Sequence, residues 1–125
     1  MTDFAAAANR LVDAYNAKDF ATLEALMAPD LDFSHFNRDF AFRRREDLMA
    51  VLRTFAADLV PDRRFLVPER VTVAGPVVVR EGFYTGTAAV DIPGFASAGG
   101  KIRLKFCSVL RFDHQGLLVE WKDYG

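Results

Sequence analysis

The feature that most constrains the fold is a change in the spacing of apolar residues near residue 64. Before this point, apolar side chains recur every three or four residues, as they do along one side of an α-helix. Beyond it, apolar and polar side chains alternate, as they do on the two faces of a β-strand. Helices followed by a run of long antiparallel strands predict an α+β fold, with helices packed on one face of a curved sheet.

Three helices are expected in the first half of the chain, at residues 4–15, 20–27 and 45–59. Thr2 or Asp3 can cap the first helix and Asp19 the second, because their side-chain oxygens accept hydrogen bonds from free backbone N–H groups. Pro29 stops the second helix, and Pro61 marks the turn that ends the third.

Five strands are expected, at residues 31–36, 65–74, 77–90, 101–112 and 117–124. Gly75-Pro76 predicts a tight turn, and residues 91–100 and 113–116 are expected to be connecting loops. Gly82 and Gly86 lie inside one of these strands and predict a bulge or a sharp curl there. Such a curl is typical of a sheet that bends around a cavity.

The last strand carries a carboxylate in an apolar setting. Read at a period of two, four of its residues point to the same face: Leu117, Val119, Trp121 and Asp123. An unpaired charge on an apolar face is unfavourable, so Asp123 is expected to have either a partner or a chemical function.

A histidine has a comparable position in the first strand, where Leu31, Phe33 and His35 share one face. A carboxyl group facing an imidazole suits proton transfer on a carbonyl compound, as in enolisation, aldol-type ring closure, isomerisation or dehydration. The alternative is that Asp123 and His35 satisfy each other, or nearby backbone groups, at the end of the sheet.

Composition argues against several other classes of function. The 125 residues fit one domain covering residues 1–125, and a net charge of −1 predicts neither a nucleic-acid partner nor a membrane. The arginines at 43–45 and 63–64 are expected to be solvated. Two distant histidines offer no metal-ligand spacing, and no phosphate-binding loop is present, so no metal is expected. One cysteine and an N-terminus without the features of a signal peptide predict a cytoplasmic protein.

Four stretches carry a resemblance to a known family: residues 34–38, 61–65, 82–87 and 119–124. With the order of helices and strands, they resemble the SnoaL-like branch of the nuclear-transport-factor-2-like (NTF2-like) superfamily, which includes polyketide cyclases and limonene-epoxide-hydrolase relatives. The resemblance implies a cystatin-like cone of three N-terminal helices on a curved, mostly antiparallel sheet, with a pocket at its mouth. It also implies a homodimer formed through the outer sheet faces, and chemistry that needs no cofactor.

Epoxide hydrolases of this branch use an aspartate in a Trp-Arg-Asp-Tyr segment, which resembles Trp121-Lys122-Asp123-Tyr124. They pair it with a second aspartate in an Arg-x-Asp segment, but the nearest stretch here is Arg80-Glu81-Gly82. Their water-binding tyrosine and asparagine fall at Phe33 and His35, and Phe33 has no hydroxyl group. The resemblance therefore argues against epoxide hydrolysis by that mechanism, unless Glu81 faces the cavity together with Asp123.

The hypothesis from the sequence is a pocket for a small hydrophobic or polar-aromatic molecule, with Asp123 and His35 as its acid–base pair. The expected ligand-binding residues are Asn37 as a polar anchor, the apolar wall formed by Phe33, Phe83 and Trp121, and Tyr15 and Arg80. The rival hypothesis is a non-catalytic ligand-binding or dimerisation module. This rival predicts that Asp123 and His35 are tied into the core without room for a ligand.

Overall fold

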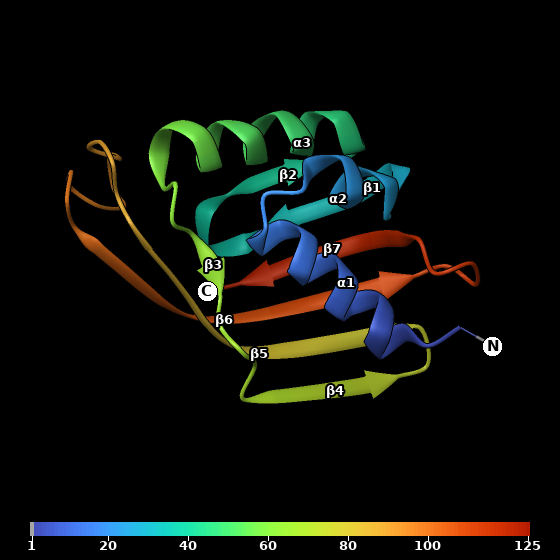
Figure 1. The fold of residues 1–125 in the computed structure, drawn as a ribbon. Helices are drawn as coiled ribbons and strands as arrows, with labels where there is room; N and C mark the ends of the chain where they lie inside the picture. The colour runs from blue at the N-terminus through green and yellow to red at the C-terminus, as the bar shows by residue number, and fades with distance from the viewer. Residues whose placement is uncertain (1) are drawn as a thin grey trace.

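The computed structural model describes residues 2–125, in which three α-helices lie on one side of a mixed sheet (Figure 1). The helices are α1 (Phe4–Asn16), α2 (Phe20–Ala25) and α3 (Arg45–Thr54), and α3 continues into a π-helical turn at Phe55–Leu59. Asp3 and Asp19 cap α1 and α2, since each accepts a hydrogen bond from the backbone N–H three residues later.

The sheet has seven strands among the described residues, and β1 and β7 are its one parallel pair there. The strands are β1 (Met27–His35), β2 (Phe40–Phe42), β3 (Arg64–Phe65), β4 (Arg70–Ala74), β5 (Val77–Thr87), β6 (Lys101–Phe112) and β7 (Leu118–Tyr124). Their order is β2-β1-β7-β6-β5-β3, and β4 also pairs with β5. The expected α+β fold, with helices on a curved and mostly antiparallel sheet, is confirmed.

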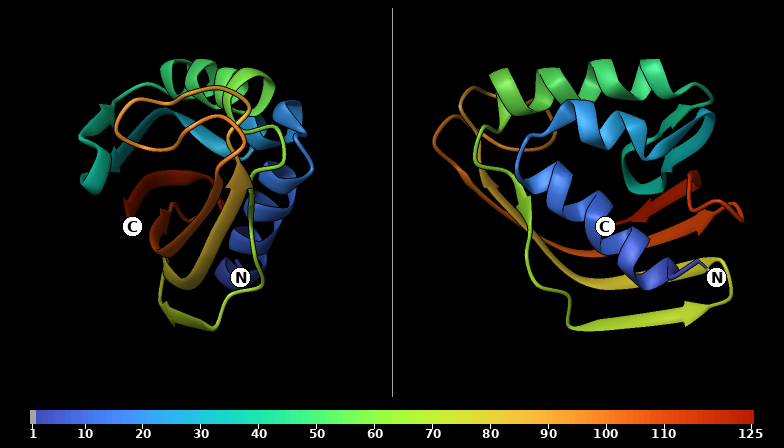
Figure 2. Two further views of the ribbon diagram at one scale, coloured as in Figure 1. Left: turned by 90° about the vertical axis from the view of Figure 1, so that its left-hand side faces the viewer. Right: turned by 45° about the vertical axis from the view of Figure 1, so that its right-hand side comes forward.

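The sheet bends strongly at one end, where β5 and β6 curl upward toward α3 (Figures 1 and 2). Gly86 lies at this end of β5, and a Cβ atom there would lie 2.3 Å from Cγ1 of the buried Val60. A side chain at this position would therefore collide with the segment that follows α3. The expected curl at Gly86 is explained by this close approach.

Two expected boundaries are wrong, and proline explains both. Met27 and Pro29 were expected in or after a helix, but both belong to β1, which has a break in register between Met27 and Asp32. Proline has no N–H for the ladder and is tolerated at such an irregularity. The expected strand 65–74 is divided into β3 and β4, with Pro68 in the gap. The short strand β2 was not expected.

The residues of β7 that point to the inner face of the sheet also differ from those predicted by a strict alternation. Its pairing with β6 shifts between Arg111 and Phe112, which places Leu118 rather than Val119 opposite Phe112. Leu118 is consequently fully buried, whereas Leu117 and Val119 are partly exposed. A β-bulge of this kind reverses the facing of the residues before it and leaves Trp121 and Asp123 inward.

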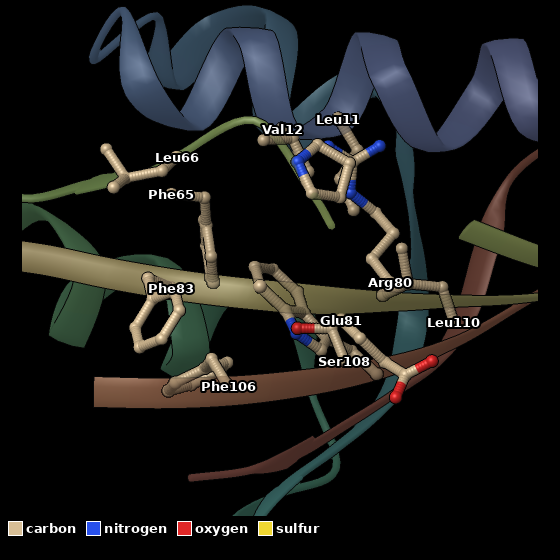
Figure 3. Close-up of a pocket in the computed structure, with 13 residues that line it drawn as sticks. Leu11, Val12, Phe65, Leu66, Arg80, Glu81, Phe83, Phe106, Ser108 and Leu110 are labelled. Carbon is tan, nitrogen blue, oxygen red and sulfur yellow. The ribbon is translucent and has the colours of Figure 1, made fainter. Parts of the chain in front are cut away.

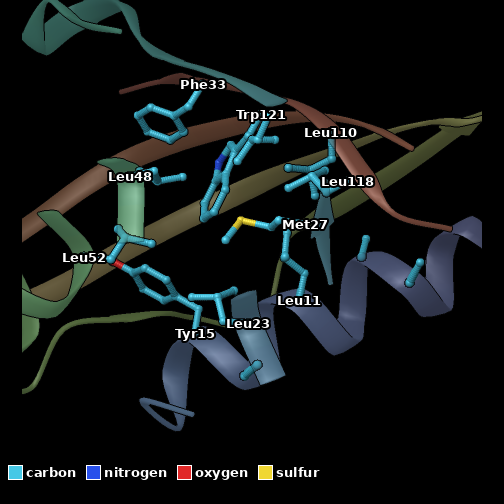
Figure 4. Close-up of a cluster of buried hydrophobic side chains, with 14 of the residues drawn as sticks. Leu11, Tyr15, Leu23, Met27, Phe33, Leu48, Leu52, Leu110, Leu118 and Trp121 are labelled. Atoms are coloured by element: carbon cyan, nitrogen blue, oxygen red, sulfur yellow. The ribbon is translucent and has the colours of Figure 1, made fainter. Parts of the chain in front are cut away.

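The core lies between α1, α2 and the inner face of the sheet. Figure 4 shows Trp121 of β7 next to Met27, with Leu11 reaching toward Met27 from α1 and the Tyr15 side chain extending toward Leu52. Aromatic rings dominate one end of this core, where Tyr15 meets Phe65 with ring centres 5.0 Å apart. The wide end of the cone is therefore lined by flat rings.

The bulge in β7 predicts unequal effects for two adjacent leucines. Leu118→Ala should lower the free energy of unfolding by about 2–5 kcal/mol, because it removes a fully buried side chain. The same substitution at the partly exposed Leu117 should lower it by about 1 kcal/mol or less. Urea unfolding of both variants measures the difference, and equal losses would contradict the observed register.

Candidate functional site

A cavity of about 790 Å³ opens at the wide end of the cone, between the inner face of the sheet and α3. This volume falls within the range of about 300–1,000 Å³ that is usual for small-molecule sites. The aromatic and polar side chains that line it include those of Tyr15, Phe33, His35, Asn37, Phe42, Phe55, Phe65, Tyr84, Phe95, Phe106, Trp121 and Asp123. Because the cavity reaches both His35 and Asp123, the closed core predicted by the non-catalytic rival is not what the structure has.

Asp123 is 3% exposed and lies between two hydrogen-bond donors. The hydroxyl of Ser108 and the indole N–H of Trp121 each donate to its Oδ1 atom over 2.7 Å. Ser108 is the residue paired with Asp123 across β6 and β7, so the register of the sheet fixes this contact. The partners of the carboxyl group are thus neutral donors and not a cation.

Burial raises the pKa of Asp123 from 3.8 to about 7, although the hydrogen bonds from Ser108 and Trp121 act in the opposite direction. Both of these bonds end on Oδ1, and within residues 2–125 no hydrogen bond to Oδ2 occurs. Oδ2 is therefore the oxygen that keeps its capacity to accept a hydrogen bond, on a side chain that lines the cavity. A carboxyl group that titrates near neutral pH is suited to accept and return a proton.

His35 is paired with Asp123 across the parallel strands β1 and β7. Its ring packs edge-on against Phe106, with ring centres 5.4 Å apart, and its Nδ1 atom is buried without a hydrogen-bond partner among the described residues. Burial lowers the pKa of His35, and the charge of Arg38 lowers it further. In the part of the chain that the structure describes, no hydrogen bond joins His35 to Asp123, so any cooperation between them would run through a ligand.

Two tyrosines form a second polar group in the cavity wall. The hydroxyl groups of Tyr15 and Tyr84 are hydrogen-bonded over 2.8 Å, and both side chains line the cavity. Burial raises the pKa of Tyr15 to about 12 and that of Tyr84 well above its ordinary value. Both therefore remain protonated at neutral pH. Because one hydroxyl donates to the other, one O–H of the pair is left to donate to a ligand. Tyr84 was not among the expected site residues, although the alternation of inward and outward residues along β5 was an available signal.

Phe83 was expected in the cavity wall, but it lies on the opposite face of β5, because β-strand neighbours alternate and Tyr84 points inward. The ring of Phe83 lies 3.9 Å beneath the guanidinium carbon of Arg103 and is also covered by Lys105. The sequence identified the correct strand but the wrong face.

Arg80 and Glu81 diverge from the same strand (Figure 3). Arg80 rises toward α1, where its guanidinium donates to the Asn9 side chain over 2.7 Å, beside a separate cavity of about 20 Å³. Glu81 points to the outer face and is bound by Arg70. Arg80 therefore lies outside the large cavity, and Glu81 does not join Asp123 as a second catalytic carboxylate.

The remaining expected residues lie at the wall and at the mouth of the cavity. Phe33 packs edge-on against Trp121 with ring centres 5.4 Å apart, so these two rings form the expected apolar wall. Asn37 lies on the exposed 3₁₀ turn at Phe36–Arg38 and lines the mouth. Phe95 of the loop at residues 91–100 also lines the mouth, and the guanidinium of Arg38 lies 4.3 Å from its ring centre.

The described residues form neither a metal site nor a membrane-spanning helix. Within residues 2–125, no three side chains of His, Cys, Asp or Glu are grouped as metal ligands. None of the helices in this range has the length and apolar character needed to cross a membrane.

Comparison with known proteins gives a family match and many structural matches. A family model described as "SnoaL-like domain" matches residues 8–121. No curated protein matches the sequence. A candidate polyketide cyclase from Xanthomonas campestris pv. campestris has a TM-score of 0.84 and 17% identity, over 98% of this chain and 89% of that one.

Two further structures extend the comparison. An epoxide hydrolase from M. tuberculosis, described as LEH-like, has a TM-score of 0.71 and 20% identity, over 94% of this chain and 78% of that one. A protein from Catenulispora acidiphila with a ketosteroid isomerase-like fold, solved with trimethylamine, has a TM-score of 0.76 and 17% identity, over 95% and 84% of the two chains. At these identities the likeness shows a common NTF2-like fold and no particular reaction.

The raised pKa of Asp123 predicts a pH-dependent stability. Between about pH 4 and about pH 7 the folded protein keeps this proton, whereas the unfolded chain releases it. The free energy of unfolding should therefore fall as the pH rises through this window, by about 4 kcal/mol at most.

Urea unfolding at several pH values measures this effect as the difference in the free energy of unfolding between the wild-type protein and Asp123→Asn. Asp58→Asn serves as the control, because it replaces an exposed carboxyl group and leaves Asp123 in place. A difference between wild type and Asp123→Asn that is constant from about pH 4 to about pH 7 would show that Asp123 titrates normally.

Proposed function

The chain belongs to the SnoaL-like domain family, and from this premise we propose that it is a cofactor-independent enzyme that transfers protons on a carbonyl-containing small molecule. The reaction is of the isomerase or cyclase type. The single observation that carries the proposal is that the buried carboxyl group of Asp123 lines a cavity of about 790 Å³. Burial raises the pKa of this group to about 7. A buried carboxyl group that titrates in a cleft has the features of a catalytic base.

Asp123 acts first as the base in this proposal. Its Oδ2 atom removes a proton from a carbon next to the carbonyl group, and the electron pair of the C–H bond moves to form an enolate. The protonated Asp123 then returns the proton to another carbon, which completes an isomerisation. In a ring closure, the enolate carbon instead attacks a second carbonyl group, and the proton ends on the new alkoxide oxygen. In both routes the atoms and electrons balance without an oxidant or a metal.

The other cavity residues hold the substrate in this proposal. The paired hydroxyls of Tyr15 and Tyr84 offer a hydrogen bond to the carbonyl oxygen. The aromatic wall of Phe33 and Trp121 favours a flat, partly unsaturated ligand. His35 is a neutral imidazole in this setting and contributes a hydrogen bond near the mouth, with Asn37 as a second polar contact. The structural relative named as a candidate polyketide cyclase is consistent with this substrate class.

Ligand binding without turnover is the second candidate function. The same cavity would serve it, and the observation in its favour is that Asp123 already has two neutral hydrogen-bond donors. A protein that binds cyclic ketones but does not exchange their α-protons with solvent would belong to this class.

Replacement of the base tests the catalytic proposal. Exchange of α-protons for deuterium in small cyclic ketones, followed by NMR, should fall by about 10²–10⁴-fold in Asp123→Asn. The wild-type rate should rise with pH through about 7, because only the ionised carboxyl group accepts a proton. Asp58→Asn, at an exposed carboxylate beyond α3, is the matched control and should keep the wild-type rate. Equal exchange by both variants would refute the assignment of Asp123.

We also propose that the protein is a cytoplasmic homodimer that associates through its outer sheet face. The partly exposed side chains of Val79, Cys107 and Val109 lie there. Light scattering should then give twice the mass of the chain, and a monomer at high concentration would contradict this proposal.

A further inference from the structure

The guanidinium of Arg63 is buried directly behind the wall of the cavity. Although it follows the Pro61-Asp62 turn and was expected to be solvated, its residue is only 2% exposed. Its guanidinium carbon lies 4.1 Å from the centre of the Tyr15 ring, and Tyr15 itself lines the cavity. A fixed positive charge therefore lies one ring behind the ligand site, because a guanidinium keeps its charge in proteins.

Within residues 2–125 this charge has no hydrogen-bonded counter-ion. The Nε, Nη1 and Nη2 atoms of Arg63 are all buried without an acceptor. The adjacent carboxylate, Asp62, is engaged elsewhere, since its two oxygens accept from the backbone N–H and the hydroxyl of Thr87. The carboxyl group of Asp123 accepts from Ser108 and Trp121.

A buried charge without a partner is strongly unfavourable. The face of the Tyr15 ring offsets only part of this penalty, because a cation–π contact is weaker than the lost hydration of the ion. A negative charge placed on the other side of Tyr15, in the cavity, would stabilise the arrangement further. Electrostatic attraction is large there because the surroundings are mostly apolar.

The influence of Arg63 is greatest at the tyrosine end of the cavity. Its charge acts against burial and lowers the pKa of both Tyr15 and Tyr84. The pKa of Asp123 is governed instead by burial and by its bonds to Ser108 and Trp121. At the hydroxyl pair the charge of Arg63 is thus opposed by the negative charge of an ionised Asp123, and Arg38 is a second cation, at the mouth of the cavity.

We propose that the cavity binds its ligand as an oxyanion, with the charged oxygen against the Tyr15–Tyr84 hydroxyl pair and Arg63 as the fixed counter-charge. The ligand class is a molecule with an acidic hydroxyl group, namely a phenol or the enol of a β-dicarbonyl compound. This inference rests on the proposed function only for the location of the ligand. The inference goes beyond the proposed function, because it states which charge state of the ligand the cavity selects.

The proton balance follows from the same geometry. When Asp123 is ionised, a neutral phenol or enol transfers its O–H proton to Asp123 or to solvent and binds as the anion. With transfer to Asp123, the cavity holds one negative charge before and after the event. Arg63 balances that single charge, so a ligand anion beside an ionised Asp123 should bind less tightly than one beside a protonated Asp123.

The test uses 4-nitrophenol as the probe, because its phenol and phenolate forms absorb at different wavelengths. The absorbance of the bound probe across pH gives the pKa of the bound phenol directly. We expect this pKa to lie below that of the free probe in the wild-type protein. Arg63→Met should weaken phenolate binding by about tenfold or more, without changing the affinity for the neutral analogue 4-nitroanisole.

Arg64→Met is the matched control, because Arg64 is the exposed neighbour in the chain and should have no effect on either affinity. Preferential binding of the neutral phenol by the wild-type protein would overturn the inference. So would equal phenolate affinities in the Arg63→Met and Arg64→Met variants, or failure of the wild-type protein to bind the phenolate.

A second pair of variants keeps the test decisive if Arg63→Met does not fold. Arg63→Lys retains the charge and should retain the preference for phenolate, whereas Tyr15→Phe removes a donor and should weaken phenolate binding alone. An unchanged phenolate affinity in Tyr15→Phe would contradict the proposed position of the oxyanion.

Anion binding without α-proton exchange would refute the proposed reaction and leave this inference intact. Exchange with a preference for the neutral phenol would refute this inference alone.

Discussion

The arrangement of the site depends on the burial of one carboxyl group, that of Asp123. Its inward position is possible because Ser108 and Trp121 donate to one of its oxygens and leave the other to the cavity. These donors are neutral, so they satisfy the group without fixing it as a carboxylate. A cationic partner would instead have lowered its pKa and made it a weaker base.

The register of the sheet creates this environment. Across the inner face, His35, Asp123, Ser108 and Arg80 are successive partners on four adjacent strands. The row therefore runs from the cavity to the contact with α1, and each polar group has a different environment. Arg80 donates a hydrogen bond to Asn9, whereas Asp123 accepts hydrogen bonds from neutral groups. Arg80 is thus held away from the base, Arg38 lies at the mouth of the cavity, and Arg63 acts at the tyrosine end.

The order of elements could be predicted from the sequence because apolar spacing depends on local geometry alone. The position of Asp123 on an inward face could also be predicted, since it shares that face with Trp121. In other strand segments, the face of the sheet to which each residue points could not be predicted. The bulge in β7 buries Leu118 where the alternation had predicted Leu117. In β5 the inward residue is Tyr84, one position after the expected Phe83. The burial of Arg63 depends on how the segment after α3 packs beside β5, which no local pattern encodes.

The most direct test of this account is a titration of the Asp123 carboxyl carbon by NMR in the folded, ligand-free protein. We expect a midpoint at about pH 7, because burial outweighs the two hydrogen bonds. Ser108→Ala should move the midpoint higher, since it removes a donor that favours the charged form. A midpoint near the ordinary value of 3.8 would show that Asp123 is fully ionised at neutral pH, and would contradict its role as the proton-transferring group.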